Sequence, residues 1–211
     1  MHKQLSLLGR MVDGYKKHGW RTHSLNALLE GPLDAFLTRI SVYGNIDLVV
    51  QQGETSVVMI AGRSEAAVRN IGQSLTMGAM RFRQLDGETS RVVVALTLPF
   101  IPSIQHNGIG DVYAYDINQD EVVLGMLGAG TIQAWGKANA IAVALSGEGS
   151  IDTSGLQSQL VIAKLSGIGT VKVYAAAELD SDISGVGDVL ILGNPPLVNA
   201  SSGGSGAVVR V

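Results

Sequence analysis

The sequence predicts an all-β fold, a single-stranded, parallel and right-handed β-helix (β-solenoid) with coils of about 19 residues and Gly-x-Gly corners. Three observations support this prediction: a glycine pair that recurs at a fixed spacing, apolar residues that alternate around each pair, and the composition. Glycine occurs 27 times in 211 residues, whereas proline occurs only 5 times. Because average glycine usage is about 7%, the excess indicates a repeated backbone feature rather than a flexible linker.

The glycine pair recurs 6 times after residue 106. The first glycines of successive pairs are 20, 19, 20, 18 and 19 residues apart, and they are Gly108, Gly128, Gly147, Gly167, Gly185 and Gly204. A fixed period of this length is the sequence signature of a solenoid, in which each repeat forms one unit of the stack. Glycine adopts positive φ without a Cβ penalty, so we expect each pair to form a sharp corner between two strands.

Apolar residues alternate with polar or small residues on both sides of each pair. Four residues after the first glycine, every repeat carries a β-branched residue: Val112, Ile132, Ile151, Val171, Val189 and Val208. Before the pair, apolar residues stand at every second position, as in Val122, Leu124 and Met126. Alternation of period two indicates strands with one buried face. Each coil is therefore predicted to hold two strands, and the strand after the corner is expected to end near a further glycine in three repeats: Gly136, Gly155 and Gly193.

The chain is predicted to divide into an irregular leader, residues 1–33, and a solenoid domain, residues 34–211. Within the less regular first half, residues 35–100 are interpreted as the first, longer coils of the same solenoid. A short helical turn is expected over Ser64–Asn70. The strands expected in this half include Val57–Ile60, Met80–Phe82 and Val92–Leu98.

The leader offers a cap for one open end of the solenoid. Ser24 is a typical helix N-cap residue, so a short capping helix over Ser24–Glu30 is one interpretation, and a disordered leader is the alternative. The apolar segment Leu5–Leu8 is too short for a signal peptide. No window reaches the roughly 18 apolar residues of a membrane span. We therefore expect neither an export signal nor a membrane span.

Charge and composition exclude several classes of function. The formal net charge is −3, so the chain has no basic field that would attract nucleic acid. It contains no cysteine, which excludes disulfides, thiolate metal sites and cysteine nucleophiles. The segment Gly125–Gly130 superficially resembles a phosphate-binding loop, but such a loop must open a helix. Here an alternating strand pattern follows it, so a structural corner is the better interpretation.

Acidic residues offer no catalytic pair. Asp111 and Asp188 occupy the same column of the repeat, but they are separated by about 19 Å at the usual strand spacing. Two-carboxylate glycoside hydrolysis needs about 5–9.5 Å. Asp152 and Lys172 are expected to form a surface ion pair, and His106 to be solvated or to cap a corner. We therefore predict no catalytic residue, no metal site and no cofactor.

Surface recognition has a modest set of candidate residues. Tyr115, Trp135 and Tyr174 share the column seven residues after the corner glycine, where a stacked aromatic stripe can bind sugar rings or a protein surface. Packing against the rest of the protein is the alternative for these aromatic residues. Asp111 and Asp188 complete the set of candidate recognition residues.

Three segments, taken in their order along the chain, resemble a known family: Phe36–Gly53, Val94–Val112 and Gly193–Val211. The likeness covers roughly residues 35–211 and is to the bacterial family named "putative auto-transporter adhesin, head GIN domain". That resemblance implies a β-helix-like domain at the cell surface or in the periplasm, usually behind a signal or lipoprotein leader. It implies no catalytic residues.

The predicted function is a non-catalytic, envelope-associated scaffold or an adhesion or binding module, with a protein or a glycan as its partner. Two alternatives belong to other classes. One is a polysaccharide-active lyase or hydrolase on the same fold. The other is a purely structural oligomerisation unit, in which copies join through the ends of the solenoid, for example along the apolar last strand Ala207–Val211.

Overall fold

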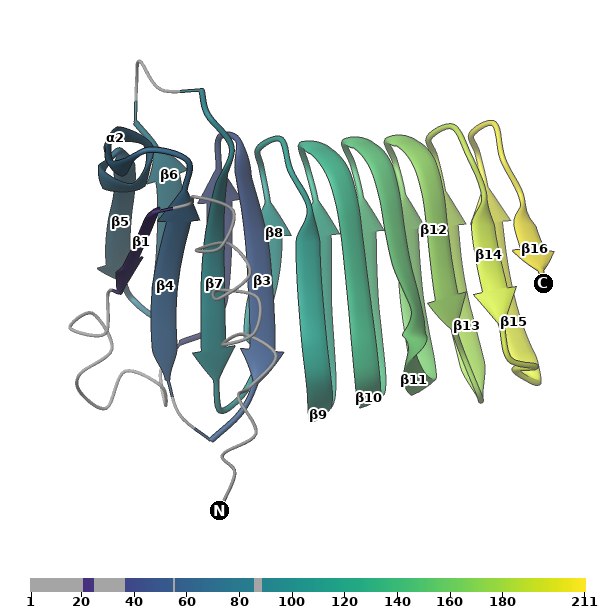
Figure 1. Cartoon of the computed structure of the whole chain (residues 1–211). Helices are drawn as coiled ribbons and strands as arrows, with labels where there is room; N and C mark the ends of the chain where they lie inside the picture. The colour runs from purple at the N-terminus through teal and green to yellow at the C-terminus, as the bar shows by residue number, and fades with distance from the viewer. Residues whose placement is uncertain (1–20, 25–36, 55, 86–88) are drawn as a thin grey trace.

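In the computed structural model, the described residues (21–24, 37–54, 56–85 and 89–211) form a β-solenoid with one short helix. Each regular coil has one strand after its glycine corner and one strand before the next corner. The equivalent strands of successive coils pair in parallel and lie side by side along the stack (Figure 1). These strands form two faces, which we name the post-corner sheet and the pre-corner sheet. The predicted parallel, all-β solenoid is confirmed.

The two sheets share the long strands β9 (Val112–Met126), β10 (Ala129–Leu145) and β11 (Glu148–Leu165), which contribute their first halves to one and their second halves to the other. The post-corner sheet also contains β7 (Val92–Leu98), β3 (Ile46–Gln52), β12 (Ile168–Tyr174), β14 (Val189–Leu192) and β16 (Val208–Arg210). The pre-corner sheet also contains β6 (Ala79–Gln84), β2 (Arg39–Tyr43), β8 (Ser103–His106), β13 (Glu178–Ile183) and β15 (Leu197–Ser202). Three further strands lie at the N-terminal end of the stack: β1 (Arg21–Ser24), β4 (Val57–Gly62) and β5 (Ile71–Thr76).

The glycine corners stack on one another, and at both positions of a pair a side chain would collide with the preceding coil. A Cβ on Gly128 would lie 1.8 Å from the carbonyl oxygen of Gly108 in the preceding coil, and a Cβ on Gly130 would lie 1.9 Å from that of Gly110. Five of the six second glycines also have positive φ, +143° at Gly130, which L side chains rarely adopt. The chain therefore stacks its corners at a separation that leaves no room for a side chain.

The strands after the corner are longer than the sequence predicts. Gly136 and Gly155 were expected to end a strand, yet they lie inside β10 and β11, which contain 17 and 18 residues. The backbone bends there instead, with a shift of register between Ala134 and Gly136 where β10 pairs with β9. Gly136 has a φ of +133°, so it allows the bend without interrupting the pairing. Only Gly193 directly follows the end of its strand, β14.

The space between the two sheets is filled by aliphatic columns. Ile132, Ile151 and Val171 of the post-corner sheet are fully buried, and so are Leu145 and Leu165 of the pre-corner sheet. Burial of each such side chain contributes about 1.5–3 kcal/mol. Because each column continues from coil to coil, a coil buries its apolar face only against its neighbours. The buried columns that the alternation predicts are confirmed.

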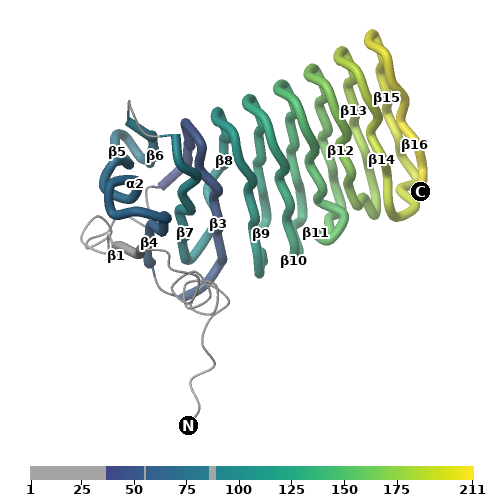
Figure 2. Tube along the Cα trace, turned by 45° about the horizontal axis from the view of Figure 1, so that its top comes forward, coloured from purple at the N-terminus to yellow at the C-terminus, as the bar shows by residue number. Residues whose placement is uncertain are grey.

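The strands of residues 39–98 lie in the same sheets as the regular coils, but they are not stacked in sequence order. The coil of β2 and β3 lies between the coil of β8 and β9 and the strands β6 and β7, although β6 and β7 follow it along the chain. The end is then closed by antiparallel strands, because β4 pairs with β7 and β5 pairs with β6 (Figures 1 and 2). Alternation identifies which face of a strand is buried, but it carries no information on the order of stacking.

The short elements of the N-terminal part agree with the prediction where they are described. The strands expected near residues 57–60, 80–82 and 92–98 are β4, β6 and β7. The helical turn is α2 (Glu65–Arg69), whose N-cap Ser64 accepts a hydrogen bond from the amide of Ala67 at 3.0 Å. Ser24 ends β1, which pairs antiparallel with β4, rather than starting a described helix. Residues 25–30 of the expected capping helix lie outside the described residues, and the boundary at residue 34 stays a prediction.

Candidate functional site

The aromatic column on the outer side of the post-corner sheet is partly assembled. The rings of Tyr115 and Trp135 stack with centroids 4.8 Å apart and planes 4° from parallel, and Tyr113 stacks on Tyr115 at 6.4 Å. Trp135 lies over Gly155 of the next coil, where a Cβ would come within 2.2 Å of its ring. No ring contact joins Tyr174 to this stack among the described residues. The structure therefore brings two of the three predicted aromatic residues together, and Tyr113 joins them.

Packing explains much of this stack. Tyr113 and Tyr115 are partly buried against a small second apolar cluster on the outside of the sheet, formed by Val49, Ala61, Val93 and Ala95. Burial raises the pKa of both tyrosine hydroxyls, so both rings are neutral near pH 7. The packing alternative accounts for Tyr115, whereas a recognition role for Trp135 and Tyr174 stays a prediction.

The aspartates of the recognition set hold neighbouring coils together. Asp111 accepts a hydrogen bond from the backbone amide of Thr131 at 3.0 Å, and Asp188 accepts one from Ala207 at 2.9 Å. Asp47 does the same for the amide of Asp111, at 2.9 Å. All three stand three residues after a corner glycine, and each joins its own coil to the next coil of the stack. Sequence reasoning missed Asp47, because Gly44 stands at its corner without a second glycine.

Arg91 joins two of these aspartates. Its guanidinium makes two hydrogen bonds to the carboxylate of Asp47, at 2.5 and 2.7 Å, and one to Asp111 at 2.7 Å. These hydrogen bonds and charges raise the pKa of Arg91 above its usual value. The side chain of Asp47 is 11% exposed, whereas that of Arg91 is 51% exposed. The arginine thus neutralises a nearly buried carboxylate at the junction of the irregular and regular coils.

His106 is neither solvated nor a cap, so that prediction is wrong. Its side chain is 0% exposed and lies in the interior column between Val42 and Met126. Nε2 lies 3.0 Å from the carbonyl oxygen of Ile46, and Nδ1 has no partner among the described residues. Burial lowers the pKa of the imidazole, which keeps it neutral. The predicted pair of Asp152 and Lys172 is confirmed as a weak surface contact, at 3.8 Å.

The outer side of the pre-corner sheet carries three chemically distinct zones. The first is basic and contains Arg39, Arg81 and Arg83 on β2 and β6. The second, which we name the aliphatic strip, lies on β9, β10 and β11, where Val123, Ala142 and Ile162 occupy one row with Val123 44% and Ile162 48% exposed. The third is an acidic ladder on β13: Glu178, Asp180 and Asp182.

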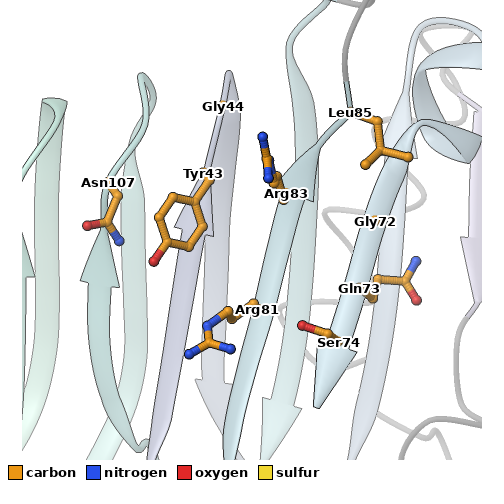
Figure 3. A pocket seen from close by; sticks show the side chains of 9 residues that line it. All are labelled: Tyr43, Gly44, Gly72, Gln73, Ser74, Arg81, Arg83, Leu85 and Asn107. Carbon is orange, nitrogen blue, oxygen red and sulfur yellow. The ribbon is translucent and has the colours of Figure 1, made fainter. Parts of the chain in front are cut away.

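A cavity of about 690 Å³ opens in the basic zone, and we name it the arginine cavity. Arg81 and Arg83 project from β6 between β2 and β5, with Ser74 on one side and Tyr43 and Asn107 on the other (Figure 3). The two arginines stand two positions apart on one strand, so they point to the same side of the sheet. Sequence reasoning missed this cavity, because the antiparallel pairing of β5 with β6 that forms one wall has no signal in the repeat.

Among the described residues, neither a cluster of metal ligands nor a membrane-spanning helix is found. No group of three or more histidine, aspartate or glutamate side chains among them is arranged to hold a metal ion. The carboxylates of Asp111 and Asp47 are occupied by backbone amides and Arg91. In the described part of the chain, no helix has the length and apolarity needed to cross a membrane.

Solved structures with the same fold come from bacteria of the genera Bacteroides and Parabacteroides. A structure titled as a putative adhesin from Bacteroides fragilis NCTC 9343 superposes with a TM-score of 0.69 at 18% identity, covering 91% of this chain and 97% of that one. A putative lipid binding protein from Parabacteroides distasonis ATCC 8503 superposes with a TM-score of 0.54 at 16% identity, covering 92% of this chain and 97% of that one. A putative adhesin from Parabacteroides merdae ATCC 43184 superposes with a TM-score of 0.53 at 13% identity, covering 91% of this chain and 95% of that one. At these identities the likeness establishes the fold.

The family comparison covers most of the chain. None of the curated proteins compared with the chain matches it. The family model described as "Putative auto-transporter adhesin, head GIN domain" matches residues 36–195, which include strands β2 to β14 and all but the last corner. The match agrees with the resemblance stated from the sequence segments. The chain therefore belongs to this head GIN domain family.

Proposed function

We propose that this chain is a non-catalytic binding module of the adhesion type that works at the bacterial cell envelope. Its family and the adhesin titles of similar structures support a binding role. The single observation that carries the proposal is the outer side of the pre-corner sheet. There the basic zone, the aliphatic strip and the acidic ladder lie on neighbouring strands of one continuous surface.

The aliphatic strip is the part of this surface that folding does not require. Leu160 is 41% exposed and Ile162 is 48% exposed, although the strand alternation would allow polar residues at both positions. Contiguous exposed apolar residues with a polar rim are typical of interaction sites. Arginines on one side and carboxylates on the other supply the charged rim that gives such a surface specificity.

Binding of fluorescently labelled protein to washed cells of the bacterium that encodes it tests the proposal. The variant Val123→Thr/Ile162→Thr keeps β-branched residues at outward positions, so it preserves the strands while making the strip polar. We expect it to lower cell binding several-fold. The matched control is Ile168→Thr, at a position that is 58% exposed but begins β12 of the post-corner sheet. Equal binding by the strip variant and the control would contradict the proposal.

Self-association through the end of the solenoid is a second candidate function. On the last coil Leu197 is 47% and Val209 is 40% exposed, and β16 pairs with β14 alone among the described strands. An unpaired strand edge with apolar side chains is a template for pairing with another chain. Deletion of Ala207–Val211 followed by size-exclusion chromatography tests this candidate. A change from oligomer to monomer would support it, whereas an unchanged monomer would reject it.

A further inference from the structure

We propose that the arginine cavity binds the carboxylate of an acidic saccharide, such as a uronic-acid oligosaccharide. The inference rests on the proposed binding function and names a ligand class for one zone of the binding surface. The cavity volume of about 690 Å³ lies within the range of roughly 300–1,000 Å³ that is typical of small-ligand sites. Its lining combines two cations, an aromatic ring and uncharged polar groups (Figure 3).

The two arginines of the cavity are available to a ligand. Neither Arg81 nor Arg83 makes an ion pair or a side-chain hydrogen bond within the described part of the chain. By contrast, Arg69, Arg91 and Arg210 each bond to a carboxylate or an amide oxygen. Two adjacent guanidinium groups without partners among the described residues, in a protein of net charge −3, indicate a local requirement for an anion. The planar fork of arginine matches a carboxylate in particular.

The remaining lining favours a sugar as the carrier of that carboxylate. The ring of Tyr43 lies beside the arginines on β2 and its side chain is 37% exposed, so it offers an apolar face to a sugar ring. Ser74 on β5 and Asn107 after β8 add a hydroxyl and an amide that can bond to sugar hydroxyls. An acidic peptide would also bond to the arginines through its carboxylates, so a glutamate tripeptide is the competing ligand in the test below.

The cavity is held open by glycine. Gly72 lies opposite Arg83 in the β5–β6 pair, and a Cβ at that position would come within 3.0 Å of Leu85. Gly44 forms the far wall with a φ of +105°, and a Cβ there would lie 2.6 Å from Cβ of Gln84. Because the walls are strands and a stacked corner, the arginines project from a rigid frame, which lowers the entropic cost of binding.

Isothermal titration with a galacturonic-acid trisaccharide tests the inference, with the neutral galactose trisaccharide as the matched ligand. We expect saturable 1:1 binding of the acidic trisaccharide alone. Arg81→Gln/Arg83→Gln should weaken it at least about tenfold, since hydrogen bonds to charged groups are among the stronger ones. Arg81→Lys/Arg83→Lys, which keeps the charge but loses the fork, should give an intermediate affinity. The control Arg63→Gln/Arg69→Gln removes the same charge outside the cavity and should bind like the unaltered protein.

Three outcomes would overturn the inference: no binding of the acidic trisaccharide, equal binding by the glutamine variant and its control, or tighter binding of a glutamate tripeptide than of the sugar. Circular dichroism spectra of all variants establish that they are folded. The cell-binding experiment remains a separate test. If cells still bind through the aliphatic strip while the trisaccharide does not bind, the saccharide inference fails and the proposed function stands.

Discussion

The regular coils from Gly108 onward and the N-terminal end of the stack reach stability by different means. In the regular coils, glycine corners and aliphatic columns repeat with the same contacts, so each coil is held by the coil before it. At the N-terminal end, β4 and β5 pair antiparallel with the outermost strands, and Arg91 joins Asp47 to Asp111. A repeat therefore specifies how coils stack, whereas the end of the stack needs contacts of its own to cover an open edge.

The largest expected difference between the two regions comes from glycine. Gly130→Ala forces a Cβ to 1.9 Å from a backbone oxygen at a φ of +143°, so we expect loss of more than about 4 kcal/mol or no folding. In the N-terminal part, Gly62→Ala brings its Cβ to 3.0 Å from a methyl of Val68, which can move, and should cost about 1 kcal/mol. Urea unfolding measures both changes.

Gly203→Ala is the control for this pair, because nothing lies within 4 Å of a Cβ at that position. Its free energy of unfolding should stay within about 0.5 kcal/mol of the unaltered protein. If Gly130→Ala behaved like Gly203→Ala, the close stacking of corners would be wrong.

The second expected effect concerns the interior columns. Leu145→Ala should lower the free energy of unfolding by about 2–5 kcal/mol, because the side chain is 0% exposed and the neighbouring coils cannot collapse onto the gap. Leu160→Ala, on the outer side of the same sheet and 41% exposed, should change it by less than about 0.5 kcal/mol. Thermal unfolding in parallel compares the two. A similar loss in both variants would mean that the aliphatic strip is buried and is no binding surface.

A smaller difference in stability is expected between two aspartates, Asp111 at the junction with the N-terminal part and Asp188 near the other end of the stack. Asp111→Ala removes the partner of both Arg91 and the Thr131 amide, so we expect a loss of about 1.5–3 kcal/mol. Asp188→Ala removes only the bond to the Ala207 amide at an exposed site, and should cost about 0.5–1.5 kcal/mol. Equal losses in urea unfolding would show that Arg91 adds nothing at the junction.

The smallest expected effect is a pH dependence from His106. Burial lowers its pKa in the folded protein, whereas in the unfolded chain the pKa is near 6.5. Below pH 6.5 the unfolded state therefore binds more protons than the folded state, and the free energy of unfolding falls as the pH falls. His106→Met, which matches Met126 in the next coil, should reduce this slope between pH 7 and 5.5 (a range set by the reference pKa of about 6.5). An unchanged slope in urea titrations at each pH would contradict the assignment.

The regular coils could be predicted from the sequence because each of their determinants is local. The six glycine pairs predict the corners. The β-branched residues at a fixed offset from them, such as Ile132 and Val171, predict the buried face. The stacking order of β2 and β3 could not be predicted, because pairing partners far apart in sequence leave no trace in a period. The burial of His106 could not be predicted for a related reason. Its neighbours in the column, Val42 and Met126, are buried, yet a polar residue gives no alternation signal.

The candidate site was less predictable than the fold. Tyr115 and Trp135 do stack, but Tyr115 packs against a cluster that includes Val49 and Ala95, which the sequence does not place nearby. The arginine cavity needs the β5–β6 hairpin beside β2, an arrangement set by tertiary contacts alone. Asp111 and Asp188 were identified as surface residues, whereas their bonds to the next coil follow only from the register.

Cross-linking of adjacent coils tests the stacking most directly. The hydroxyl oxygens of Ser146 and Ser166, twenty positions apart in the chain, lie 3.0 Å from each other on successive corners. Since the chain has no cysteine of its own, Ser146→Cys/Ser166→Cys should form an intramolecular disulfide almost completely under mild oxidation. Ser146→Cys/Ser184→Cys, whose residues are two coils apart, about 9.6 Å at the strand spacing, should stay reduced. Disulfide formation in the second variant but not in the first would contradict the register that brings the residues of the aliphatic strip into one row.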